Sequence, residues 1–123
     1  MDAQGFKPKA YLKEGCPFSF KYLLFMTEAG LLDRIEVVRL NQQDPAFEKV
    51  KAELGAGLGK AATFPTVEIE PGRYLSDSDR LIEHFAVPDG IRPEGMPVLS
   101  FYKETIFPQV VELHRRKSAE KNG

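Results

Sequence analysis

The chain has 123 residues, with 17 Lys or Arg against 18 Asp or Glu, so its formal net charge is −1. This length fits a single domain, and the 42% hydrophobic content with balanced charge excludes a disordered chain. The near-neutral charge gives no reason to expect nucleic acid or a membrane surface as a partner. One cysteine excludes an internal disulfide and a multi-cysteine zinc site. Without an apolar span or a signal peptide, we expect a cytoplasmic protein.

Residues 9–40 predict a strand, a helix and a second strand. The pattern at residues 9–13 is extended, and a turn follows it. From Cys16 to Ala29, apolar residues recur at helical spacing, with a proline in the first turn. Residues 35–40 are rich in β-branched side chains, which favours a second strand. Cys16 is therefore predicted to open a helix that leaves a strand.

The next part of the chain predicts a helix, a hairpin and another helix. Apolar residues from Phe47 to Leu54 share one helix face, and a glycine-rich loop is expected at residues 55–60. Strand patterns flank a Pro-Gly turn, and candidate N-cap residues at 76–79 precede a third helix. The order β-α-β-α-β-β-α over residues 9–86 predicts an α/β domain with a mixed sheet.

The composition divides the chain into three regions. We expect an α/β domain at residues 1–86, a linker rich in Pro and Gly at 87–97, and a helical extension at 98–123. Pro108 interrupts the helical pattern of the extension, which predicts a kink or two short helices. The apolar face of the extension either covers the sheet or makes a homodimer contact.

Cys16 is the candidate for chemistry. A thiol in the first turn of a helix meets the positive end of the helix dipole and unpaired backbone N–H groups, which stabilise a thiolate. Lys13, three residues upstream, could add a positive charge. The alternative is an inert, buried cysteine. Because no second cysteine exists, a dithiol exchange cycle is excluded.

The segment Lys13-Glu-Gly-Cys-Pro-Phe-Ser19 resembles the active-site segment of glutaredoxins and of cysteine-type, omega-like glutathione S-transferases. The segment Phe64-Pro65-Thr-Val-Glu-Ile, with the residues up to Phe85, is similar to the second half of the transferase N-terminal domain. The resemblance covers residues 9 to 86. It implies a thioredoxin-like fold with a four-stranded mixed sheet, in which Pro65 is a cis-proline facing the cysteine.

The resemblance also implies a glutathione site. Cys16 would be the nucleophile, and Ser19 would donate a hydrogen bond to its thiolate. The implied glutathione-binding residues are Lys13, Phe18, Phe64, Pro65, Asp77 and Ser78.

Each end of glutathione has an implied partner. The backbone of Phe64 would pair with the cysteinyl part, and Lys13 would meet the glycyl carboxylate. The γ-glutamyl carboxylate would sit on N–H groups at Ser78 or Asp79, with Asp77 attracting the ammonium group. Helix capping is the alternative role of these residues.

One departure from the family pattern and the placement of the histidines bear on the site. Three residues separate Lys60 from Phe64, which argues against a ligand role for Lys60. His84 and His114 lie far apart in the sequence, so no metal is expected.

We predict a glutathione-dependent monothiol thiol-disulfide oxidoreductase, with glutathione as co-substrate and a disulfide or glutathionylated substrate as partner. The alternative is a non-catalytic glutathione-binding or protein-interaction module. A transferase acting on an electrophile ranks last, because the residues after Pro97 are too few for the helical second domain of the transferases.

Overall fold

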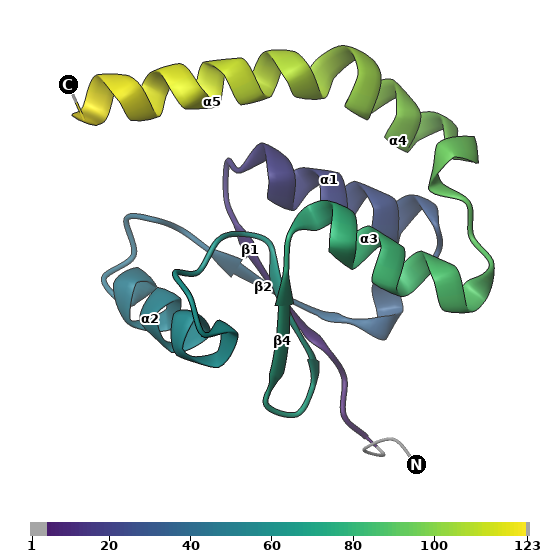
Figure 1. Cartoon of the computed structure of the whole chain (residues 1–123), viewed down its shortest axis with the longest axis horizontal. Coiled ribbons are helices and arrows are strands. Elements are labelled where there is room, and N and C mark those ends of the chain that lie inside the picture. Colours follow the sequence, from purple (N-terminus) through teal and green to yellow (C-terminus); the bar gives the residue numbers. More distant parts are fainter. Residues whose placement is uncertain (1–4, 123) are drawn as a thin grey trace.

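A mixed four-stranded sheet lies at the centre of the computed structural model, which describes residues 5–122, with side chains as far as Lys117 (Figure 1). Its strand order is β2-β1-β3-β4; β1 pairs with β2 in parallel and with β3 antiparallel, and β3 pairs antiparallel with β4. The predicted order of strands and helices is confirmed. The strands are β1 (Lys9–Lys13), β2 (Glu36–Leu40), β3 (Thr66–Glu70) and β4 (Arg73–Ser76).

Helices cover both faces of this sheet. Two of them lie side by side on one face and a third lies on the opposite face (Figure 1). The pair is α1 (Pro17–Glu28) and α3 (Ser78–Ala86), and the third helix is α2 (Phe47–Leu58). Short 3₁₀ turns follow α1 and α3 at Leu32–Arg34, Val87–Asp89 and Pro93–Gly95.

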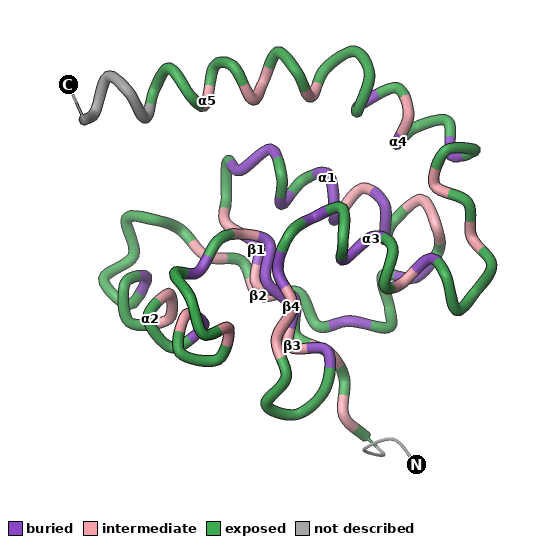
Figure 2. Tube along the Cα trace, viewed as in Figure 1, coloured by how far each residue is buried: buried purple, intermediate pink, exposed green. Residues whose placement is uncertain are grey.

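The main core lies between the sheet and the α1–α3 pair. Tyr22, Phe25 and Met26 of α1 are fully buried there, against Val67 of β3 and Leu81 of α3. The buried segments of α1, α3 and the central strands face one another in Figure 2. This packing holds the N-terminal ends of α1 and α3 on the same side of the sheet.

Helix α2 is longer than predicted, because it continues through the expected glycine loop as far as Leu58. Gly57 explains the continuation. A Cβ atom at this position would lie only 2.5 Å from the Tyr74 ring of β4, so glycine lets the last turn of α2 approach the sheet. Gly59, with φ +75, then ends the helix in the left-handed conformation.

The C-terminal extension is one helical run in three parts: α4 (Pro97–Phe101), a π-helical turn (Tyr102–Ile106) and α5 (Phe107–Asn122). Pro108 lacks an N–H donor, and the π-helical turn ends two residues before it, so the run widens instead of breaking.

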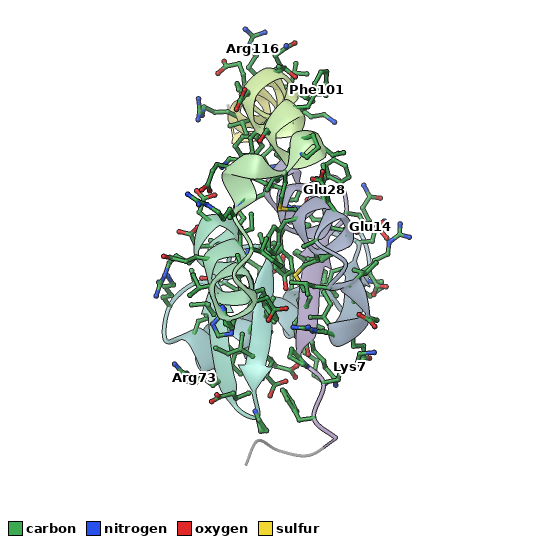
Figure 3. All side chains as sticks on the ribbon, turned by 90° about the vertical axis from the view of Figure 1, so that its right-hand side faces the viewer. Lys7, Glu14, Glu28, Arg73, Phe101 and Arg116 are labelled. Carbon is green, nitrogen blue, oxygen red and sulfur yellow. The ribbon has the colours of Figure 1, made fainter. Side chains whose placement is uncertain are left out.

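One face of the extension packs on the α/β domain, while the other stays exposed. Leu99 and Tyr102 are buried on the α1 side, whereas Phe101 and Leu113 are exposed. Figure 3 shows Glu28 of α1 beneath the extension that carries Phe101. None of the helices within residues 5–122 has the length and apolar content needed to cross a bilayer.

Candidate functional site

Cys16 is the N-cap residue of α1, with φ −90 and ψ 121, and Pro17 is the first helical residue. Gly15, with φ +79, makes the turn from β1 that a residue with a Cβ atom would strain. The first hydrogen bond of α1 runs from the N–H of Phe20 to the carbonyl of Cys16 at 3.0 Å. The cysteine therefore stands at the positive end of the helix dipole.

The Cys16 thiol faces the loop that precedes β3. Its Sγ donates a hydrogen bond to the carbonyl oxygen of Phe64 at 3.8 Å. The Phe64–Pro65 peptide bond is cis, as the family resemblance implies. Only 8% of the Cys16 surface is exposed. The fold thus brings together two segments of the predicted site that lie far apart in the sequence.

A cavity of about 460 Å³ adjoins this pair at the N-terminal end of α3. Four of the predicted glutathione-binding residues line it: Phe18, Phe64, Asp77 and Ser78. The remaining lining residues are Lys21, Lys60, Thr63, Ser76 and Asp79.

Asp77 caps α3 at the edge of this cavity. Its carboxylate accepts hydrogen bonds from the backbone N–H groups of Asp79 at 3.0 Å and Arg80 at 3.5 Å. Its φ of 85 is in the left-handed region, which is strained for a residue other than glycine. The capping role that the sequence offered as an alternative is therefore present in the structure.

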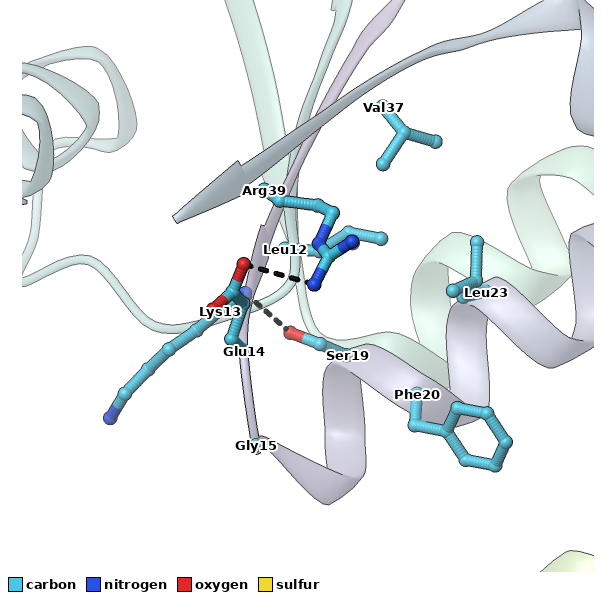
Figure 4. Close-up of a pocket in the computed structure, with 9 residues that line it drawn as sticks. All are labelled: Leu12, Lys13, Glu14, Gly15, Ser19, Phe20, Leu23, Val37 and Arg39. Atoms are coloured by element: carbon cyan, nitrogen blue, oxygen red, sulfur yellow. Dashed lines mark hydrogen bonds and ion pairs between the residues drawn. The ribbon is translucent and has the colours of Figure 1, made fainter. Parts of the chain in front are cut away.

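Lys13 and Ser19 lie on the other side of the first turns of α1, in a second cavity of about 300 Å³ (Figure 4). The hydroxyl of Ser19 accepts a hydrogen bond from the backbone N–H of Lys13 at 3.1 Å. The Lys13 side chain extends away from Ser19, as Figure 4 shows. Arg39 and Glu14 form an ion pair of 3.1 Å at this cavity. The structure thus separates these two predicted residues from the cavity at α3.

Sequence reasoning did not single out Lys21, and it argued against a ligand role for Lys60. The ammonium of Lys21 forms an ion pair with Asp79 at 2.8 Å, although the Lys21 side chain is only 4% exposed. Lys60 reaches the same cavity from the end of α2. A signal for Lys21 was available, because it follows Phe18 and precedes Phe25 on the apolar face of the predicted helix.

Residues 15–87 match the model of a family described as "Glutathione S-transferase, N-terminal domain". The chain belongs to this family. The match begins next to Cys16 and ends just after α3, so it contains every residue that lines the cavity at α3. No curated protein sequence is a significant match to the chain.

Solved structures show the same thioredoxin-like fold for this transferase domain. Glutaredoxin 2 from Salmonella typhimurium, in complex with glutathione, is 20% identical with a TM-score of 0.54, over 76% of this chain and 37% of that chain. A possible glutathione S-transferase from Rhodopseudomonas palustris is 20% identical with a TM-score of 0.53, over 84% of this chain and 54% of that chain. The chain therefore spans between about a third and about half of the length of these two structures.

Tyr102, which lies beyond the family match, reaches the site of this transferase domain from the extension. Its hydroxyl donates a buried hydrogen bond to the carbonyl of Pro17 at 2.9 Å. Its ring packs edge-on against Phe20, with ring centroids 5.0 Å apart. Burial raises the pKa of Tyr102, and the nearby negative charge of Cys16 raises this pKa further. The extension therefore covers the turn of α1 that carries the thiol.

Within the part of the chain that the structure describes, no three His, Cys, Asp or Glu side chains gather as ligands for a metal ion.

Proposed function

We propose that this domain is a glutathione-dependent monothiol thiol-disulfide oxidoreductase with Cys16 as its nucleophile. One observation carries the proposal: the thiol at the N-terminus of α1 faces the Phe64 carbonyl, next to a cavity at the N-terminus of α3. A helix N-terminus stabilises a thiolate, which is the reactive form in disulfide exchange. The neighbouring fold of glutaredoxin 2, solved in complex with glutathione, supports glutathione as the co-substrate.

The reaction runs through two exchanges at one sulfur atom. The Cys16 thiolate attacks the glutathionyl sulfur of a mixed disulfide, the substrate–glutathione S–S bond breaks, and the substrate leaves as a thiolate that takes a proton from water. A second glutathione, as thiolate, then attacks the glutathionyl sulfur held on Cys16. Oxidised glutathione leaves and the Cys16 thiolate is regenerated, so one glutathione thiol is oxidised for each substrate sulfur that is reduced to a thiol.

The cavity at α3 would bind the γ-glutamyl end of glutathione. This group carries one carboxylate and one ammonium group, and the cavity has both charge types on its walls. The N–H of Ser78 at the start of α3 is suited to the carboxylate, and the Asp77 carboxylate is suited to the ammonium group. Phe64 and Pro65 would hold the cysteinyl part beside Cys16, while Phe18 would cover it.

Lys13 would bind the glycyl carboxylate at the opposite end of the tripeptide. It lies on the far side of the first turn of α1 from Ser78, so glutathione would cross the thiol in an extended form. Ser19, whose oxygen accepts from the Lys13 backbone, would turn its own hydroxyl proton toward the thiolate. These roles need a ligand-dependent rotation of the Lys13 side chain.

The test is reduction of a glutathionylated peptide by the domain in the presence of glutathione, with Cys16→Ser as the matched variant. We expect turnover only with Cys16, together with one glutathionyl adduct per chain by intact mass. Equal rates for the two proteins would refute the proposal. Since the chain has one cysteine, the adduct has only one possible position.

A non-catalytic glutathione-binding module is the second candidate, and the burial of Cys16 favours it. With 8% of its surface exposed, the thiol offers little room for a bulky disulfide. In this case Cys16→Ser would bind glutathione as tightly as the unchanged domain, and neither protein would turn over. Measuring binding and turnover on both proteins separates the two candidates.

A further inference from the structure

A lysine is buried at the cavity where the γ-glutamyl group is proposed to bind. Lys21 follows Cys16 by five residues on α1, and its side chain is 4% exposed. Lysine is almost never buried to this degree unless its charge is paired. Its partner is Asp79 Oδ1 at 2.8 Å, and the Asp79 side chain is 71% exposed. The cation therefore lies inside the protein, while its counter-ion lies at the surface.

Two aromatic rings also lie near the Lys21 ammonium. Nζ lies 4.5 Å from the ring centroid of Phe107 and 5.9 Å from that of Phe18. Aromatic faces attract a cation but do not replace a strong hydrogen-bond acceptor. An ammonium group has three N–H donors, and among the described residues only Asp79 accepts one of them. Lys21 therefore keeps donor capacity at the cavity that it lines.

The N-terminus of α3 is short of donors by itself. The Asp77 carboxylate already accepts hydrogen bonds from the N–H groups of Asp79 and Arg80. This leaves Ser78 with the first-turn N–H group suited to a ligand at that position. A carboxylate placed there needs a second partner of opposite charge, and Lys21 contacts the same turn through Asp79.

We propose that Lys21 recognises the α-carboxylate of the γ-glutamyl group, and that this carboxylate competes with Asp79 for the Lys21 ammonium. The inference rests on the proposed function and adds a specificity-determining side chain to it. The Phe107 ring of the extension lies 4.5 Å from the Lys21 ammonium, and the Lys21 side chain is buried. A charge-assisted hydrogen bond is stronger in such a shielded place than in water.

The experiment compares two peptides that differ by one carboxylate. One is reduced glutathione, and the other is 4-aminobutyryl-cysteinyl-glycine, which lacks the α-carboxylate of the first residue. Binding is measured by calorimetry on proteins that also carry Cys16→Ser, so that no disulfide exchange contributes. We expect this domain to prefer glutathione by roughly tenfold or more, which is the size of one charge-assisted hydrogen bond.

Three variants test whether Lys21 is the source of this preference. Lys21→Met keeps most of the side-chain volume without the charge, and we expect it to lose most of the preference for glutathione, with only the contribution of the Ser78 N–H remaining. Lys21→Arg keeps the charge and should retain the preference. Lys103→Met, which removes an exposed lysine of the extension, is the control for net charge and should also retain it.

Asp79→Asn separates ligand recognition from a purely structural ion pair. If Asp79 competes with the ligand for Lys21, the Asp79→Asn domain binds glutathione as tightly as the domain with Asp79, or several-fold more tightly. If the ion pair only fastens α3 to α1, Asp79→Asn weakens binding as much as Lys21→Met does, and the inference is wrong. If Lys21→Met does not fold, weaker glutathione binding by Asp79→Asn than by the unchanged domain overturns the inference.

The outcomes distinguish this inference from the proposed function. A full preference for glutathione in Lys21→Met overturns the inference and leaves the proposed function intact. A domain that binds neither peptide overturns the proposed function itself, and the inference with it. Loss of the preference in Lys21→Met, with its retention in Lys21→Arg, Lys103→Met and Asp79→Asn, supports both.

Discussion

Glu28 connects the C-terminal extension to the α/β domain, and its removal should loosen the extension. The two carboxylate oxygens of Glu28 accept hydrogen bonds from the backbone N–H groups of Val98 and Leu99, each at 2.8 Å. The N-cap residue of α4, Met96, makes no side-chain capping bond. A side chain at the end of α1 therefore caps α4, a helix that begins about 70 residues later.

The expected loss of stability follows from these two hydrogen bonds. Replacing a capping side chain by alanine costs about 1 kcal/mol, and losing a negative charge at an exposed helix N-terminus costs about 0.3–1 kcal/mol. Glu28→Ala should therefore lower the free energy of unfolding by about 1–2 kcal/mol. Glu28→Gln keeps one acceptor oxygen without the charge, so about half of that loss is expected.

Urea denaturation measures this loss, and hydrogen exchange shows where it occurs. Glu83→Ala is the matched control, because Glu83 is exposed on α3 and forms no ion pair with the residues that the structure describes. We expect faster exchange at the amides of Val98 and Leu99 in Glu28→Ala only. A stability within about 0.5 kcal/mol of the control, with unchanged exchange at these amides, would refute the capping role.

Four further predictions concern tyrosine hydroxyls and the turn before the thiol. The buried hydroxyl of Tyr22 has no hydrogen-bond partner in the described part of the chain, so Tyr22→Phe should raise the free energy of unfolding in urea by about 1 kcal/mol. Tyr102→Phe removes the hydroxyl that donates to the Pro17 carbonyl and should lower the free energy of unfolding by about 1 kcal/mol. If the two variants changed the free energy of unfolding in the same direction, this reasoning would be contradicted. Burial raises the pKa of Tyr22 and of Tyr102 above the ordinary 10.0, so their contribution to stability is fully present below pH 10 and is lost as the pH rises beyond it. Denaturation followed by circular dichroism should show this alkaline loss, and Tyr22→Phe should reduce it; an unchanged alkaline loss would count against burial as its cause. Gly15→Ala should cost about 1 kcal/mol, because φ is +79 there, and should alter the rate at which iodoacetamide alkylates Cys16; an unchanged rate would show that this turn does not position the thiol.

Local signals were sufficient to predict the strand and helix that carry Cys16. Pro17 fits the first position of a helix, and the apolar spacing that follows it matches the buried face of α1. The cis bond before Pro65 came from the family resemblance and not from local spacing. Local pattern thus located the thiol, and resemblance located the loop that faces it.

Contacts between distant segments explain what the sequence did not predict. A lysine among helical residues is usually exposed, and Lys21 is buried because α3 contributes Asp79 and the extension contributes Phe107. The three residues between Lys60 and Phe64 gave no reason to expect Lys60 at the cavity. The left-handed turn at Gly59 instead directs the chain so that Lys60 borders the cavity at α3.

The second cavity adds a geometric constraint on any ligand of Cys16. Phe18 and Lys21 of α1 line the cavity at α3, whereas Ser19 and Phe20 line the cavity next to Lys13. The first turns of α1 therefore separate two sites with cationic side chains. A ligand with a carboxylate at each end and a sulfur between them can reach both sites only by crossing Cys16. Glutathione would satisfy this constraint in a single orientation, with its γ-glutamyl end in the cavity at α3 and its glycyl end at Lys13. Only the γ-glutamyl end carries the ammonium group that Asp77 would accept.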